Sequence, residues 1–372
     1  MNKIILIGNG FDLAHGLKTS YKDFINDFWK QKASLFQERY KDKKLLGHTQ
    51  GRISISGNTY KDDDITIENI YYYSNVSFAE NNSKEGFEYF KYSLSCIDEE
   101  LEKNIVFDNK FLKQITNNLS LTNWVDIESE YYIALNECLK KEIEDEPEDR
   151  VEKLNKDFFL VKNALKKYLA KQENDKESTK ILNKLNSIID PLGTRLSLNP
   201  VLDNNILFLI FNYTNTSYSY VYIFSKYFPD KISYIYIHGE LNNQINHIVF
   251  GYGDEIDEKY KIIENKNNNR YLENVKSIMY MERDNYKRLL EFIDSEEYEI
   301  FIMGHSCGIS DRTLLNTLFE HEKCHSIKVF YHKEKDNTDN YSDVIRNISR
   351  NFTDKALFRK IVVDKTNCVP LS

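Results

Sequence analysis

The sequence KIILIGNGFDLAHGLKTSYKDF, residues 3–24, decides the fold class of this chain. It opens with an apolar run without alternation, which is typical of a strand buried on both faces of a parallel sheet. Turn-forming and polar residues follow directly: Gly8, Asn9, Gly10, Asp12 and Gly16. The two close glycines let the backbone turn tightly, and their amide groups, with the start of the next helix, predict a seat for a phosphate group. The third glycine comes six residues after the second rather than three, so a tight turn without a ligand is an equally good interpretation of this motif.

Composition limits the class of protein. The chain has 372 residues, of which 41% are apolar, as is ordinary for a globular protein of one large or two modest domains. The net charge of -8 argues against a broadly basic nucleic-acid-binding surface and leaves room only for a local basic groove.

Cysteine usage and apolar runs bear on the location of the protein. The five cysteines are widely spaced, and the sequence has neither CxxC pairs nor Cys/His ligand spacings. With no leader ahead of the first predicted strand, this pattern predicts a reducing, cytoplasmic location. No apolar run approaches the roughly 18 residues that a membrane helix needs, so we expect no membrane association.

The remaining chain divides into a helical block and an α/β core. Residues 31–199 are predicted to be a mainly helical insertion with a polar region near 40–85, in which a small hairpin is expected within 53–67. The predicted helices of this insertion fall within 88–184 and include residues 129–146 and 151–171, with a further helix at 180–189.

Short apolar runs alternate with helical patterns beyond residue 200. The predicted strands are 205–211, 232–237, 247–250, 298–303 and 327–331, and the predicted helices between them are 217–227, 285–295 and 312–321. This alternation predicts an α/β fold in which residues 1–30 and 200–372 form a Rossmann-like, mostly parallel sheet with helices on both faces.

Polar residues stand at the ends of four predicted strands. They are Gly8, Asn9 and Gly10 with Asp12; Asn212, Tyr213 and Thr214; His238 and Gly239; and Gly304, His305 and Ser306 with Asp311 just beyond. Ligands of open parallel sheets bind beyond the carboxyl ends of the strands, so these sets would meet at one rim if the strands are neighbours. Structural roles also fit each set, because Asn and Asp cap helices and a strand-end His can bond a backbone carbonyl.

Five motifs occur together in chain order: GNGFDLAHGLKTSYKDF, WVDIE, FNYTNT, YIHG and GHSCGISD. Together they resemble the AbiH-type bacterial abortive-infection (phage-defence) family over nearly the whole chain, with residues 40–85 matching least. The series GxG, strand-end Asn, His-Gly and GxS near an Asp is more distantly similar to the sirtuin-like NAD-binding superfamily, whose defence members hydrolyse NAD. This resemblance implies a sirtuin-like core, NAD as substrate or ligand, cleavage of the bond between nicotinamide and ribose, and no metal.

The resemblance also implies a role for each matching position. Asn212 would hold ribose hydroxyls and position a water, and His238 would be the base, with a pKa near the ordinary value of about 6.5. The other residues expected to bind NAD are Gly8, Asn9, Gly10, Asp12, Thr214, Gly304, His305, Ser306 and Asp311. Thr214 stands where sirtuins usually carry an Asp, which argues against full NAD hydrolysis. The absence of CxxC zinc pairs argues against protein deacetylation.

Two further functions fit the sequence. A metal-dependent nuclease would need clustered carboxylates, for which the candidates are Asp12, Asp126, Glu128 and Asp311. A non-catalytic nucleotide sensor would act through assembly into a homo-oligomer. The helical insertion is a candidate contact surface for such assembly, for a phage-derived trigger or for a partner defence protein. His321 and His325 have the spacing of metal ligands, but without further ligands nearby we expect no metal there.

Overall fold

The computed structural model describes residues 1–43, 59–68, 84–96, 101–118, 124–141, 148–174, 204–334, 336 and 338–371. Within these ranges the chain forms two compact units. Unit 1 comprises residues 1–19, 131–140 and 169–372, and unit 2 comprises residues 20–130 and 141–168.

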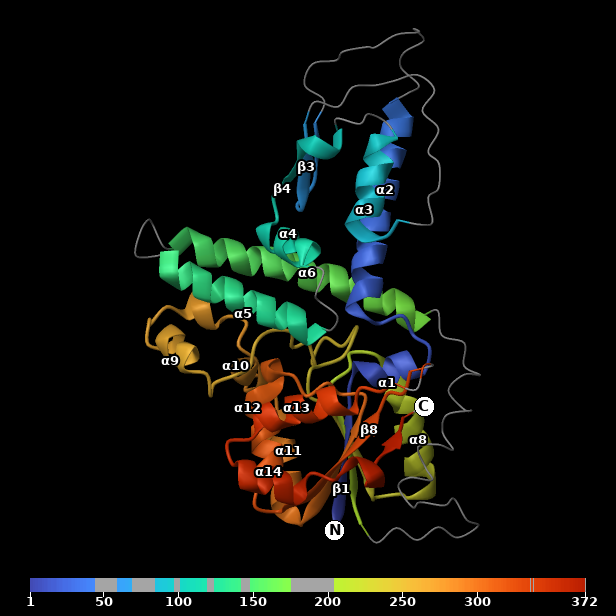
Figure 1. The fold of residues 1–372 in the computed structure, drawn as a ribbon, viewed down its shortest axis with the longest axis vertical. Helices are drawn as coiled ribbons and strands as arrows, with labels where there is room; N and C mark the ends of the chain where they lie inside the picture. The colour runs from blue at the N-terminus through green and yellow to red at the C-terminus, as the bar shows by residue number, and fades with distance from the viewer. Residues whose placement is uncertain are drawn as a thin grey trace. The chain divides into compact units, whose positions relative to one another are not determined.

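Unit 1 is built on a six-stranded sheet with the strand order β6-β5-β1-β7-β8-β9. Two of these strands, β1 and β8, are labelled in Figure 1. The strands are β1 (Asn2–Ile7), β5 (Ile206–Ile210), β6 (Ile232–Tyr236), β7 (Tyr298–Met303), β8 (Cys324–Tyr331) and β9 (Val369–Pro370). Every neighbouring pair is parallel, and β1 lies between β5 and β7. The prediction of a Rossmann-like, mostly parallel sheet is therefore confirmed.

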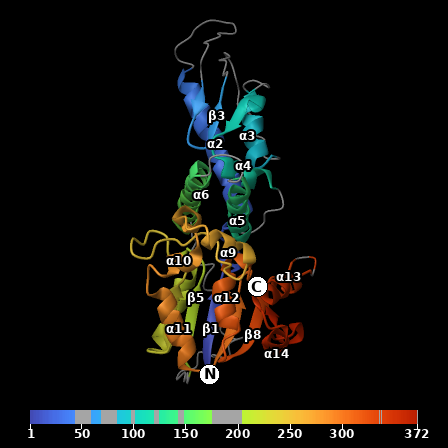
Figure 2. The ribbon, with the colours of Figure 1, turned by 90° about the vertical axis from the view of Figure 1, so that its left-hand side faces the viewer.

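Helices cover both faces of this sheet, because alternate residues of each strand enter different cores. Ile4 and Leu6 of β1 pack with the helices α11 (Asn285–Ser295), α12 (Arg312–Phe319) and α13 (Tyr341–Asn351). Ile5 and Ile7 pack instead with α1 (Asn9–Ala14) and α8 (Tyr218–Tyr227). Figure 2 shows the strands and the helices α11 to α14 from a second direction. The remaining α-helices among the described residues of this unit are α9 (Glu258–Glu264), α10 (Lys276–Tyr280) and α14 (Lys355–Ile361). Residues 131–140 of α5 (Trp124–Lys141) and the end of α6 (Glu148–Asn174) also belong to unit 1.

One predicted strand of unit 1 is wrong. Residues 247–250 are not a strand, although Ile248, Val249 and Phe250 are buried as the apolar run predicts. The Val249 amide donates to the carbonyl oxygen of His238 at 2.7 Å, outside any ladder. The run is apolar because it packs in the core as an extended connection.

Unit 2 is mainly helical and contains a small sheet. Its helices are α2 (Tyr21–Lys43), α3 (Gly86–Ser95), α4 (Lys110–Asn117), most of α6 (Glu148–Asn174) and the first part of α5 (Trp124–Lys141). The sheet consists of β2 (Tyr60–Lys61), β3 (Ile65–Ile67) and β4 (Ile105–Phe107), all antiparallel. The hairpin predicted within 53–67 is therefore present at 60–67, and β4 was not predicted. The predicted helix at 180–189 lies outside the described residues.

Lys32 explains the acidic residues of this hairpin. Its ammonium group lies 2.6 Å from carboxylate oxygens of both Asp62 and Asp64. These carboxylates therefore bind a lysine of the same unit.

Among the described residues, no helix combines the length and the apolar character needed to cross a membrane.

Candidate functional site

Four neighbouring strands of unit 1 end at one rim and carry the polar residues singled out in the sequence. Ile7 of β1 pairs with Ile210 of β5 and with Met303 of β7, and Ile210 in turn pairs with Tyr236 of β6. The four strands therefore end level with one another. This arrangement places Asn212, His238, the turn at Gly8 and the turn at Gly304 at the carboxyl edge, where parallel sheets bind ligands.

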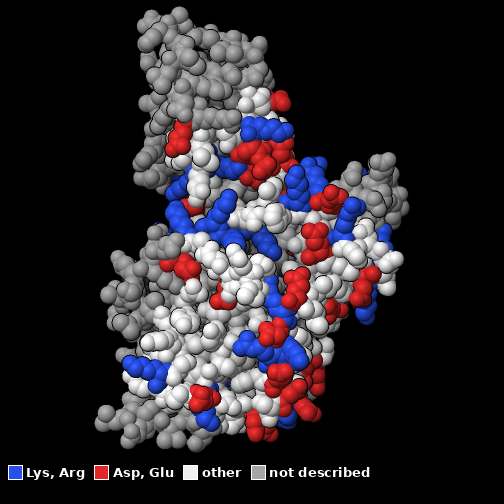
Figure 3. All heavy atoms as spheres, turned by 180° about the vertical axis from the view of Figure 1, so that it is seen from behind, with Lys and Arg blue, Asp and Glu red and all other residues white. Residues whose placement is uncertain are grey.

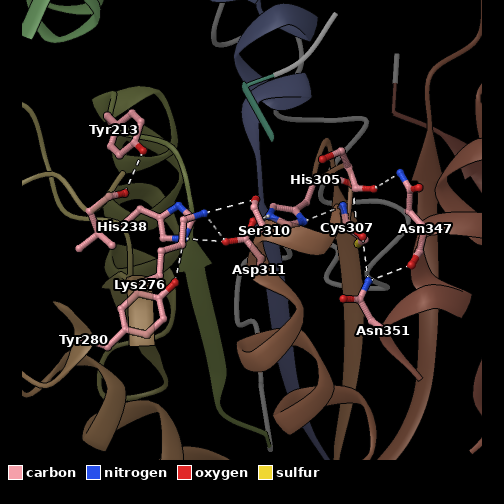
Figure 4. Close-up of polar contacts among 12 residues, drawn as sticks. Tyr213, His238, Lys276, Tyr280, His305, Cys307, Ser310, Asp311, Asn347 and Asn351 are labelled. Atoms are coloured by element: carbon pink, nitrogen blue, oxygen red, sulfur yellow. Dashed lines mark hydrogen bonds and ion pairs between the residues drawn. The ribbon is translucent and has the colours of Figure 1, made fainter. Parts of the chain in front are cut away.

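Asp311 is the centre of a buried polar cluster at this rim (Figure 4). Its Oδ1 accepts hydrogen bonds from Lys276 Nζ at 2.7 Å and from His238 Nε2 at 3.1 Å, and its Oδ2 lies 3.6 Å from His305 Nε2. Burial by itself would raise the pKa of this carboxyl, but Lys276 and His238 hold the pKa well below its usual value. The cluster therefore contains a carboxylate and an ammonium, whose charges cancel.

His238 is held by one ring nitrogen. Nε2 contacts both Asp311 and the hydroxyl of Tyr280, which lies 3.0 Å away. Because an ionised carboxylate can only accept, we place the proton on Nε2, which leaves the lone pair on Nδ1. Among the described residues, none forms a hydrogen bond with Nδ1. One nitrogen is thus oriented by Asp311 while the other can accept a proton.

The environment of His238 differs from the one that the sequence predicted. Burial, and after it the charge of Lys276, lower its pKa to about 4, against the opposing effect of Asp311. The expected pKa near 6.5 is therefore wrong. The imidazole is neutral at pH 7 and is a weaker base than an exposed histidine.

His305 is held by a hydrogen bond at one ring nitrogen and faces Asp311 with the other. The backbone amide of Cys307 donates to Nδ1 at 3.0 Å, so the proton of a neutral His305 must be on Nε2, which faces Asp311. Its ring also packs against Phe211, with centroids 4.1 Å apart. Cys307 has a φ of 54°, a left-handed conformation that is uncommon for a residue with a side chain.

Asn212 is buried, and neither atom of its side-chain amide has a hydrogen-bond partner in the described part of the chain. It stands two residues beyond Ile210, and His238 stands two residues beyond Tyr236, the partner of Ile210. An unpaired buried amide costs about 1–3 kcal/mol, so this side chain calls for a partner such as a ligand or a bound water. The alternative of a helix cap for Asn212 is therefore wrong, and the amide is available to a ligand.

The glycines bring two turns into contact. A Cβ at Gly8 would lie 2.5 Å from the Cα of His305, and one at Gly10 would lie 2.9 Å from the Cα of Gly304. The Gly8 amide donates to the Met303 carbonyl at 3.2 Å, and the Gly10 amide donates to the Gly304 carbonyl at 2.8 Å. These two amides are therefore occupied within the protein, and the expectation that both point at a phosphate is wrong.

Other predicted binding residues also have partners. Asn9 donates from Nδ2 to the carbonyl of Thr19 at 2.9 Å, and Thr214 donates from Oγ1 to Asp12 Oδ2 at 2.6 Å. Asp12 lies inside α1, and Asp311 precedes α12 without a capping bond, so the alternative of a simple helix cap is wrong for both.

Lys276 and Tyr280 were missed in the sequence. They stand four residues apart on α10, so they share one helical face, and Lys276 is only 1% exposed. Nothing in the surrounding sequence, ENVKSIMYME at residues 273–282, distinguishes these two residues from ordinary helix residues. Ser310 was also missed, and its Oγ lies 3.5 Å from Lys276 Nζ.

The acidic residues Asp126 and Glu128 lie in the part of α5 that belongs to unit 2, whereas the strand-end site lies in unit 1. In the described ranges, no three His, Cys, Asp or Glu side chains form a group that could hold a metal ion. His321, one of the two histidines with metal-like spacing, contacts Asp294 at 3.2 Å.

A protein-family model described as bacteriophage abortive infection AbiH matches residues 4–333. The match spans nearly the whole chain and includes Asn212, His238, Lys276 and Asp311. No curated protein matches the chain.

Proposed function

Because the chain belongs to the AbiH family of bacteriophage abortive infection proteins, we propose that its strand-end site serves phage defence by binding NAD and hydrolysing the bond between nicotinamide and ribose. The observation that carries this proposal is the pairing of an unsatisfied buried amide on Asn212 with a histidine that Asp311 orients. The distant resemblance to sirtuin-like proteins supports the choice of NAD.

The residues fit one half of NAD better than the other. The amide of Asn212 and Nδ1 of His238, which have no hydrogen-bond partner among the described residues, suit a ribose, whose hydroxyls both donate and accept hydrogen bonds. The amides of Gly8 and Gly10 are bonded within the protein, so they do not support the phosphate cradle. The proposal accordingly rests on the ribose-binding residues.

The chemistry asks little of the base. Nicotinamide leaves as a neutral ring that takes the electron pair of the C1′–N bond, and water oxygen forms the new bond to C1′. The sugar resembles an oxocarbenium ion in such transition states, so a weak base suffices to accept the proton of water. His238 Nδ1 would accept it and release it to solvent, while the Asn212 amide would orient the water and the hydroxyls.

The nuclease alternative finds less support. Asp311 is already bonded to Lys276 and His238, and Asp12 to Thr214, so neither carboxylate is arranged for a cation. On the face shown in Figure 3, basic side chains are mixed with acidic ones. The nuclease is therefore the less favoured function.

The test is incubation of the purified full chain with NAD, followed by chromatography of nicotinamide and ADP-ribose. We expect release that His238→Gln and Asn212→Leu abolish. His332→Gln is the matched control, because His332 is exposed at the end of β8 and contacts Glu334 at 3.3 Å. If a thermal shift shows that NAD binds but no nicotinamide is released, the protein is a nucleotide sensor rather than an NAD hydrolase. If no nicotinamide is released and nucleic acid is cleaved in the presence of magnesium, the protein is a nuclease.

A further inference from the structure

Helix α13 contacts the loop that carries His305, although it lies beyond residue 333, where the family match ends. Asn347 donates from Nδ2 to the carbonyl oxygen of Ser306 at 2.9 Å, and Asn351 donates from Nδ2 to the carbonyl oxygen of Cys307 at 2.8 Å (Figure 4). The two asparagines stand one helical turn apart, so they form hydrogen bonds with two consecutive carbonyl groups from one face of the helix.

These two hydrogen bonds fix the backbone next to the ring of His305. The same residue, Cys307, gives its carbonyl to Asn351 and its amide to His305 Nδ1. Its backbone is in the left-handed conformation, which an ordinary residue adopts only when its surroundings enforce it. We infer that Asn347 and Asn351 are positioning residues of the site, which set the ring orientation and the tautomer of His305 and so direct its Nε2 proton at Asp311.

Asn351 is well placed for this role. It is fully buried, and Nδ2 also donates to the Asn347 carbonyl at 2.9 Å, while its own carbonyl accepts from Asn316 at 2.9 Å. Val344 and Ile348 on the same helix are buried in the core of unit 1. Core packing therefore fixes the position of α13, and α13 in turn fixes the backbone of residues 306–307 through hydrogen bonds.

These contacts connect Asn347 and Asn351, through Cys307 and His305, to Asp311, the carboxylate that orients His238. A His305 whose Nδ1 carried the proton would present a lone pair to Asp311 and would clash with the Cys307 amide. The effect of α13 on NAD hydrolysis rests on the proposed function, whereas its effect on the His305 ring does not.

The experiment reads the ring directly. The full chain is labelled with ¹⁵N-histidine, and the ring signals of His305 are assigned by comparison with His305→Gln. We expect the Nε2–H tautomer in the wild type. We expect Asn351→Leu to raise the share of the other tautomer by about fivefold, the ratio associated with one ordinary hydrogen bond. Asn347→Ala, at a half-buried position, should shift the ring signals in the same direction by less.

Asn367→Ala is the matched control, because Asn367 lies in the same C-terminal segment and donates to Asp364 at the surface. It should leave the His305 signals unchanged. If Asn351→Leu does not fold, Asn347→Ala decides alone. His305 signals identical to the wild type in every folded variant would overturn the inference. Since no turnover is involved, that result is distinct from a failure to hydrolyse NAD.

Discussion

His238 Nε2 and Asp311 Oδ1 lie 3.1 Å apart at the carboxyl edge of the sheet, and Lys276 Nζ contacts the same oxygen atom at 2.7 Å. A carboxylate that orients a neutral imidazole is a recurrent arrangement for proton transfer. The lysine balances the charge of the carboxylate, and this balance keeps Asp311 ionised without charging His238.

The first prediction concerns the ion pair between Asp311 and Lys276 and distinguishes its effect on folding stability from its effect on NAD hydrolysis. Asp311→Asn removes the carboxylate partner of a lysine that is 1% exposed, and we expect it to lower the free energy of unfolding by about 3–5 kcal/mol. Adding Lys276→Met should recover most of that loss, because both charges are then absent. Urea unfolding of the two variants measures this. NAD hydrolysis should stay lost in the double variant, and a double variant as unstable as Asp311→Asn would argue against the charge pairing.

The second prediction concerns pH. His238 has a pKa of about 4 in the folded protein and about 6.5 when unfolded, so the unfolded chain binds more protons between these values. Stability is therefore expected to fall as the pH drops from 6.5 towards 4, by about 3 kcal/mol from this group. The depressed pKa of Asp311 adds a further loss at lower pH.

Urea midpoints measured across this pH range test the assignment to His238. His238→Gln should flatten the dependence, whereas His332→Gln, at an exposed position, should keep the wild-type slope. Equal slopes in all three proteins would mean that His238 titrates normally.

The third prediction concerns the unpaired amide. Asn212→Leu replaces a buried group that has no partner in the described part of the chain, and we expect the free energy of unfolding to rise by about 1–2 kcal/mol while hydrolysis disappears. Asn109 is the comparison, since it is also buried but is bonded to Leu112 and to Asp157. Asn109→Leu should therefore destabilise the protein. A destabilised Asn212→Leu would show that the amide supports the fold.

The fourth prediction concerns the two glycine turns. Gly304 has a φ of 75°, and a Cβ there would collide with the backbone of Phe11 and Gly10. We expect Gly304→Ala to lower stability by roughly 3 kcal/mol. Gly86 has a similar φ of 56°, but among the described residues a Cβ there meets only the side chain of Asn26, at 3.0 Å, so Gly86→Ala should lower stability by about 1 kcal/mol. Equal losses in thermal melts would mean that the contact between the turns adds nothing.

The sequence predicted the sheet because its strands are apolar on both faces and alternate with helical patterns. It also placed Asn212, His238 and Asp311 near strand ends, and the observed order β6-β5-β1-β7 brings those ends together. The segment at 247–250 was misread because an apolar run indicates burial and does not by itself indicate a ladder.

Other features depend on contacts between distant parts of the chain. The packing of Gly10 against Gly304 follows from the order of the strands, which the sequence alone does not reveal. Lys276 reaches Asp311 from a short helix, and Asn351 reaches Cys307 from a helix near the C-terminus. Each of these side chains is unremarkable in its own stretch of sequence, and only the fold supplies its partner.

The central claim is that this chain defends by consuming NAD at the Asn212–His238 site. The most direct measurement is the NAD content of bacteria that express the chain, before and after challenge with a phage against which it protects. We expect NAD to fall and nicotinamide to rise after infection with the wild-type chain, with both changes and protection lost in His238→Gln and retained in His332→Gln. Full protection by the wild-type chain with unchanged NAD would contradict the claim.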